Sequence, residues 1–152
     1  MKLAEALILR ADIQKRIADL RQRASQNAKV QEGSQTTEDP QALLAQVNEM
    51  YGQLTTLVQR INRTNTATAY DDTLSLADAL ALRDTLGAQQ ATYREVAQAG
   101  VPNLDRYMRS ELRYESIVDV AALQRQADDL ARQRREVDTR IQELNWLTDL
   151  VE

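Results

Sequence analysis

The chain contains no cysteine and no histidine among its 152 residues. Without cysteine it can form no disulfide, thiolate nucleophile or zinc knuckle. Without histidine it lacks the commonest general base near neutral pH and the Glu-x-x-His ligands of di-iron helical bundles. We therefore expect no catalytic residues, no cofactor and no metal site, and only metal chemistry based on carboxylates stays open.

Glycine, aromatic residues and long apolar runs are also scarce. Four glycines spread along the chain cannot form a phosphate-binding loop. The longest apolar run, Ala6–Leu9, is far shorter than the ~20 residues that span a bilayer. No signal peptide is evident, so we expect a cytoplasmic protein. A content of 43% hydrophobic but only 4% aromatic residues predicts a thin core of small aliphatic side chains, which suits helix-on-helix packing.

The charge pattern argues against nucleic acid as a partner. A net charge of −4 offers no general attraction to phosphate backbones. The run Arg106–Tyr114 interleaves arginine and tyrosine, as RNA-stacking surfaces do. However, Asp105, Glu111 and Glu115 cancel its charge, so we interpret it as structural.

Two octapeptides of the chain nearly repeat each other. Leu3–Arg10 and Leu76–Arg83 are identical at six of eight positions, and a glutamate in one is an aspartate in the other. Each octapeptide is expected to open a helix and to deliver an arginine two turns later. The repeat therefore predicts two related helical hairpins.

Three stretches, in the first, second and last predicted helices, carry apolar residues at alternating spacings of three and four, which is typical of helices that pack along a seam. Start and stop signals are Asp39-Pro40, the capping box Ser75-x-x-Asp78, and Gly100 before Pro102. The prediction is a mainly α protein of two long antiparallel hairpins with four-helix, coiled-coil-like character. We expect one helical domain over residues 1–152, with helices at about 2–29, 40–64, 76–99 and 120–147.

Three further features qualify this helical prediction. Gly52 interrupts the second helix at a cost of up to ~1 kcal/mol relative to alanine, so we expect it to mark a close contact. Thr-rich residues 66–74 and the alternating residues 106–118 predict two strands. Together they would form a small antiparallel β ribbon, which must pack on the helices or on another subunit to be stable.

The last helix has the most regular seam, which is sustained over three heptads. Because such a seam needs a partner helix along its whole length, we predict a homo-oligomer assembled through this helix and the first one. The seam residues are Leu123, Leu130, Arg134, Val137, Ile141 and Leu144.

Arginines lie on these predicted seams at Arg10, Arg83 and Arg134. They could form a buried polar layer that binds an anion or sets the register of assembly, since an unpaired buried arginine is costly. Alternatively, each stem lies on apolar surface while its head stays in water, which we favour. Carboxylates that could pair with such a layer are Asp12, Glu49, Asp84 and Glu136.

The stretch Asn62-Arg63-Thr64-Asn65 is the second candidate for ligand binding. Its donors suit a phosphate or carboxylate group, although the same residue types cap helix ends and form Asx turns, which we favour. In the ligand-binding hypothesis, a small anion binds one pocket formed by Arg10, Arg83, Asn62, Arg63 and Asn65.

The chain also resembles a bacterial family that is often labelled septicolysin. The resemblance lies in Met1–Leu7, in Asn62–Asn65, in the Leu-x-x-Ala-Leu start of the third helix, and in the run from Arg106 to Trp146. It implies no catalytic or binding residue, but its label implies a cytolysin. Our main hypothesis is a non-catalytic, self-assembling structural or interaction protein. The alternatives are an anion- or small-ligand-binding protein and a membrane-active protein.

Overall fold

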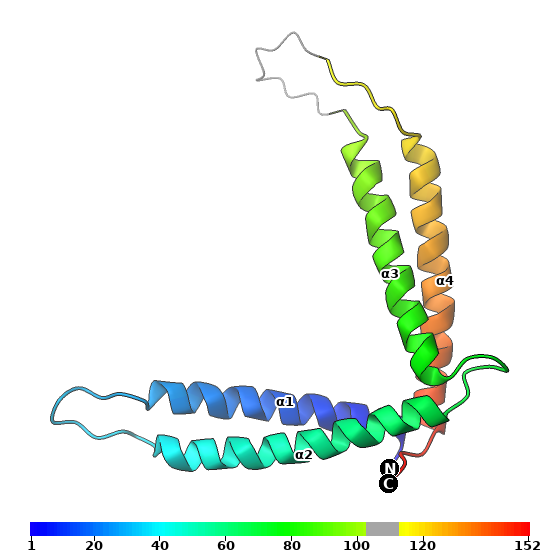
Figure 1. The fold of residues 1–152 in the computed structure, drawn as a ribbon. Coiled ribbons are helices and arrows are strands. Elements are labelled where there is room, and N and C mark those ends of the chain that lie inside the picture. Colours follow the sequence, from blue (N-terminus) through cyan, green and yellow to red (C-terminus); the bar gives the residue numbers. More distant parts are fainter. Residues whose placement is uncertain (103–112) are drawn as a thin grey trace. The chain divides into compact units, whose positions relative to one another are not determined.

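The structure, a computed structural model, describes residues 1–102 and 113–152. The described residues contain four helices, which are α1 (Leu3–Gln26), α2 (Pro40–Ala67), α3 (Leu76–Ala99) and α4 (Val120–Leu147) (Figure 1). The mainly helical fold built from packed helical pairs is therefore confirmed.

The chain divides into two compact units. Unit 1 contains residues 1–69 and 142–152, and unit 2 contains residues 70–141. Helix α4 contributes its first 22 residues (120–141) to unit 2 and its last six (142–147) to unit 1. That the chain acts as a single domain stays a prediction.

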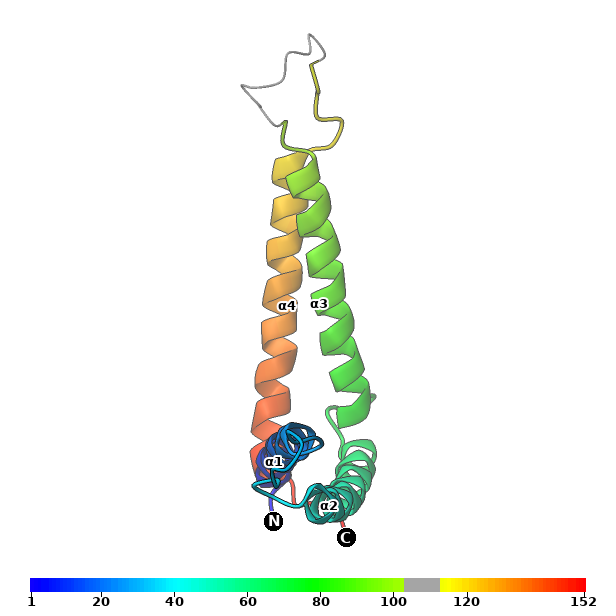
Figure 2. The ribbon, with the colours of Figure 1, turned by 90° about the vertical axis from the view of Figure 1, so that its left-hand side faces the viewer.

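Unit 1 is built on α1 and α2, which lie side by side and antiparallel (Figures 1 and 2). Their facing stripes supply its buried core, at the spacings of three and four seen in the sequence. The core residues on the two helices are Ile13, Ile17, Leu20, Ala24, Leu43, Val47, Leu57 and Ile61.

The linker between α1 and α2 is closed by Asn27. Its side-chain oxygen accepts hydrogen bonds from the backbone N–H groups of Thr37 and Glu38, each at 3.1 Å. The guanidinium of Arg23 also forms an ion pair with the Glu38 carboxylate. Gly33 has a φ of 84°, a left-handed conformation that glycine adopts without steric cost.

Unit 2 is built on α3 and residues 120–141 of α4, which lie side by side in both views (Figures 1 and 2). Its buried residues are small or aliphatic, as expected from the scarcity of aromatic residues. They include Leu76, Ala79, Leu86, Ala97, Ala127 and Ile141.

The repeated octapeptides begin α1 and α3, as predicted. In α1, the Glu5 carboxylate accepts a hydrogen bond of 2.7 Å from the backbone N–H of Lys2. In α3, Asp78 accepts the equivalent bond of 2.9 Å from Ser75, whose hydroxyl completes the predicted capping box. The first leucine and the second alanine of each copy are fully buried: Leu3, Ala6, Leu76 and Ala79.

The predicted β ribbon is wrong for the described residues. Residues 66–67 complete α2, and the following residues form a turn instead of a strand. Residues 113–118 have no regular structure, and 106–112 lie outside the described residues. The Asp71 carboxylate builds the turn, because it accepts from the N–H groups of Thr73 (2.7 Å) and Leu74 (2.8 Å). An Asx turn therefore replaces the expected strand.

Two local predictions about α2 are also wrong. The helix does not end near Asn62–Asn65 but continues to Ala67, so these residues lie inside it. A Cβ built on Gly52 would have no neighbouring atom within 4 Å, so Gly52 makes no close contact within the described chain.

Candidate functional site

The termini of the described chain meet in unit 1 and form a hydrogen-bonded structure that we call the clasp. The clasp contains residues 1–3 at the start of α1, residues 60–64 of α2, and residues 147–152, which begin at the last residue of α4 (Figure 1). The Leu3 N–H donates to the Thr148 carbonyl, and the Leu150 N–H donates to the Met1 carbonyl, each at 2.9 Å. These antiparallel bonds hold the last segment extended against the first.

Side chains of α2 bind the backbone of the same last segment. The Thr64 hydroxyl accepts from the Val151 N–H at 3.0 Å and donates to the Arg60 carbonyl at 2.8 Å. The Arg60 guanidinium donates to the Val151 carbonyl at 2.9 Å, and Arg63 donates to the Glu152 carbonyl at 3.4 Å. Because these side chains bind main-chain atoms, the clasp recognises the extended conformation of residues 151 and 152 rather than their side chains.

An ion pair closes the outer side of the clasp. The Lys2 ammonium lies 2.9 Å from the Asp149 carboxylate and also donates to the Leu147 carbonyl at 3.0 Å. The hydrogen bond and charge of Lys2 lower the pKa of the Asp149 carboxyl. Beneath this pair, Leu150 is buried and anchors the segment.

Sequence reasoning missed most of the clasp. The sequence predicts Thr64 only as part of a helix end, yet it is fully buried and central to the hydrogen bonds of the clasp. No periodicity connects residue 64 to residue 151, so a contact between them leaves no local signal in the sequence. The one available signal was a threonine on the apolar stripe of α2, three residues after Ile61.

The clasp leaves four large apolar side chains exposed, which we call the clasp surface. Its residues are Met1, Trp146, Leu147 and Val151, with Trp146 57% and Leu147 63% accessible. Tryptophan is usually well buried, and it is enriched among the residues that dominate protein interfaces. The clasp surface is therefore our candidate interaction site.

The predicted ligand-binding residues are distributed over both units. Arg10, Asn62, Arg63 and Asn65 belong to unit 1, and Arg83 belongs to unit 2. Arg10 is half-exposed, while the Arg63 guanidinium donates to Glu152 within the clasp. Binding of a ligand by these residues stays a prediction.

Arg83 forms the polar part of the α3–α4 pair in unit 2. Its guanidinium lies 2.8 Å from Asp84, one of the predicted partners, and 3.2 Å from Asp138, which was not predicted. Hydrogen bonding to Asp84, with a smaller effect from Asp138, raises the pKa of Arg83 despite its partial burial. Glu136, another predicted partner, pairs with Arg132 instead.

The seam of α4 is only partly buried. Ile141 and Leu144 are buried, Leu123, Leu130 and Val137 are half-buried, and Arg134 is exposed. The Arg134 side chain crosses α3 at Gly87, where a Cβ would lie 3.2 Å from its Nε. Use of this seam between copies stays a prediction.

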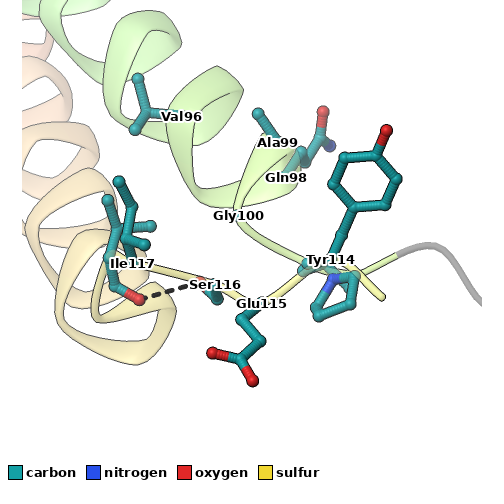
Figure 3. Close-up of a pocket in the computed structure, with 11 residues that line it drawn as sticks. Val96, Gln98, Ala99, Gly100, Tyr114, Glu115, Ser116 and Ile117 are labelled. Carbon is teal, nitrogen blue, oxygen red and sulfur yellow. Dashed lines mark hydrogen bonds between the residues drawn. The ribbon is translucent and has the colours of Figure 1, made fainter. Parts of the chain in front are cut away.

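An apolar pocket of about 840 Å³ lies where α3 ends in unit 2 (Figure 3). Val96, Val101, Tyr114 and Ile117 line it and are largely exposed. Gly100 fits closely there, because a Cβ would lie only 2.6 Å from a methyl group of Val118.

Within residues 1–102 and 113–152, no three carboxylates are grouped so that they could hold a metal ion. None of the helices described has the length and apolarity needed to cross a membrane.

Comparisons with known proteins identify a family but no activity. A crystal structure of a functionally unknown conserved protein from Corynebacterium diphtheriae is 40% identical, covers 99% of both chains and has a TM-score of 0.92. No curated protein matches the chain. Neither this structure nor the one matching family model has a septicolysin label, so the comparisons do not support that resemblance. A family model described as a family of unknown function, DUF6847, matches residues 10–150, and the chain therefore belongs to DUF6847.

Proposed function

We propose that the protein is a non-catalytic, self-assembling structural or interaction protein of the cytoplasm, whose copies associate through the clasp surface. The supporting observation is the exposure of Trp146 and Leu147 beside the hydrogen-bonded clasp. Burying such side chains on association is favourable by roughly 25 cal/mol per Å² of apolar area, before the cost of ordering is subtracted.

The position of the clasp surface fits this role. Met1 lies two residues before the first residue of α1, and Trp146 and Leu147 lie at the end of α4, so the clasp surface adjoins the start of one helix expected to assemble and includes the end of the other. Backbone hydrogen bonds hold their flanking residues, which reduces the conformational entropy lost when a partner binds.

Trp146 is the only tryptophan, so its fluorescence tests this proposal directly. As the protein is concentrated from nanomolar to tens of micromolar, we expect the emission maximum to shift to shorter wavelength while Trp146 becomes buried. Followed by sedimentation equilibrium, because it lacks the tryptophan, a W146F/L147S variant should associate more weakly, whereas exchange of the exposed Leu82 of α3 for serine should not weaken association. An emission maximum that never moves, together with unaltered association of W146F/L147S, would exclude the clasp surface.

A membrane-active role is the second candidate, because Trp146 beside Leu147 also suits insertion into a lipid interface. Dye release from liposomes of zwitterionic and anionic composition distinguishes it from self-assembly. Self-assembly predicts no release at concentrations where the Trp146 emission has already shifted.

A further inference from the structure

A groove runs between α1 and α2 in unit 1 and is continuous with the clasp. It has a volume of about 580 Å³, and its floor includes the buried residues Ile13 and Leu57. Arg60 lines one end and also binds the Val151 carbonyl, so the groove and the clasp surface adjoin.

One wall of the groove carries an unexplained glycine. Gly52 lies within the 28-residue helix α2, where alanine would stabilise the helix by up to ~1 kcal/mol. No atom of the described chain approaches the place of its missing side chain within 4 Å. One turn later, the Thr56 hydroxyl donates to the Gly52 carbonyl at 3.2 Å, which turns its polar group towards the backbone. The two residues leave a gap in the wall.

The opposite wall carries a side chain that could fill such a gap. Leu9 of α1 lines the groove and is 40% accessible, although it is a large aliphatic residue. In a dimer with a two-fold axis, the protruding leucine of each copy can enter the gap of the other copy, so the same contact forms twice.

The charges of the groove are complementary in the same way. Arg16 and Glu49 both line it, and in the described part of the chain neither has an ion-pair partner. Two copies related by a two-fold axis would place each arginine opposite the other copy's glutamate, which favours a second copy over a partner of single charge sign.

We propose that the groove is the docking site for a second copy of this chain, with Leu9 of each copy entering the gap at Gly52 of the other. Arg16 of each copy faces Glu49 of the other across the axis. The inference rests on the proposed self-assembly and specifies its partner, orientation and contact residues.

Charge reversal with mixing tests the inference. R16E gives a groove with two acidic groups beside Arg60, and E49R gives one with three basic groups, since Arg60 also lines the groove. Each variant alone should self-associate at least about tenfold more weakly than the wild type, since like charges then meet. A 1:1 mixture should recover affinity to within about threefold, because opposite charges meet again. Control reversals at exposed positions outside the groove, K15E and D128R, should leave association unchanged.

The outcomes separate this inference from the proposed function. If both reversed variants associate like the wild type, or if mixing them fails to restore affinity, the groove is not the docking site although self-assembly stands. If the wild type itself remains monomeric, both proposals are wrong.

A G52A variant provides a second test, in which thermal stability should rise while association becomes weaker. It should raise the Tm of the dilute protein, since alanine favours the helix and meets no atom within the chain. It should also weaken association, since a methyl group enters the gap. Stabilisation with undiminished association would contradict the inference.

Discussion

Thr64 is the residue whose hydroxyl joins the last segment of the described chain to α2. Its hydroxyl accepts from Val151 and donates to Arg60, and its carbonyl accepts from Thr68. The side chain is fully buried, so loss of the hydroxyl would leave the Val151 N–H without its partner in a partly buried place.

Replacement of Thr64 by valine keeps the shape of the side chain and removes only its hydrogen bonds. We expect T64V to lower the free energy of unfolding by about 1–3 kcal/mol, the usual cost of an unsatisfied buried polar group. Urea denaturation followed by circular dichroism measures the change. T64S is the control, because it keeps the hydroxyl and should be the more stable of the two variants. Equal stability of T64V and the wild type would show that the hydrogen bonds of the Thr64 hydroxyl contribute nothing to the free energy of unfolding.

Asp71 makes stability depend on pH at the turn before α3. The N–H groups of Thr73 and Leu74 lower the pKa of its carboxyl. The unfolded carboxyl keeps its ordinary pKa near 3.8, so this stabilisation is fully present above that pH and is lost as pH falls through the lower folded value.

The D71N variant keeps an acceptor oxygen but cannot titrate. We expect it to be less stable than the wild type at neutral pH, and the difference in Tm should shrink below about pH 4. Thermal unfolding at a series of pH values measures this difference. A constant difference across the acidic range would mean that the Asp71 charge does not hold the turn.

At the scale of the elements, the sequence was most informative where the start or end of a helix depends on residues close to it in the chain. The Asp39-Pro40 start, the Ser75 capping box and the Gly100 stop depend on neighbouring residues, and each occurs where predicted. The first strand of the ribbon and the end of α2 were mispredicted because a threonine-rich, polar stretch fits a strand, a turn or a helix end equally well. The contacts that decide among these, such as Thr64 with Val151, are 87 residues apart.

The end of α3 depends on the absence of a side chain at Gly100. A Cβ there would also lie 3.1 Å from a methyl group of Val120 and 3.2 Å from the Ser116 hydroxyl. We expect G100A to lower the free energy of unfolding by about 1–3 kcal/mol through overpacking. Chemical denaturation checks this value, with A99S as a control at an exposed neighbour. A stabilised G100A protein would mean that residues 116–120 do not pack against α3.

At the scale of the whole molecule, the sequence predicts self-assembly through the seam of α4 and through α1, whereas we propose the clasp surface for it. The regular spacing of the α4 seam predicts a partner helix, and two of its six members are buried within the chain while three are half-buried. The clasp surface could not be read from periodicity, since Met1 and Trp146 come from opposite ends of the sequence. The repeated octapeptides did predict equivalent helix starts, although Arg10 and Arg83 differ in their partners because only α3 supplies Asp84 beside its arginine.

Sedimentation equilibrium over concentrations from nanomolar to tens of micromolar tests self-assembly most directly. We expect the mass to rise from that of one 17.2 kDa chain to a whole multiple of it, and the W146F/L147S variant to require higher concentration for the same rise. A mass of one chain throughout this range would contradict self-assembly.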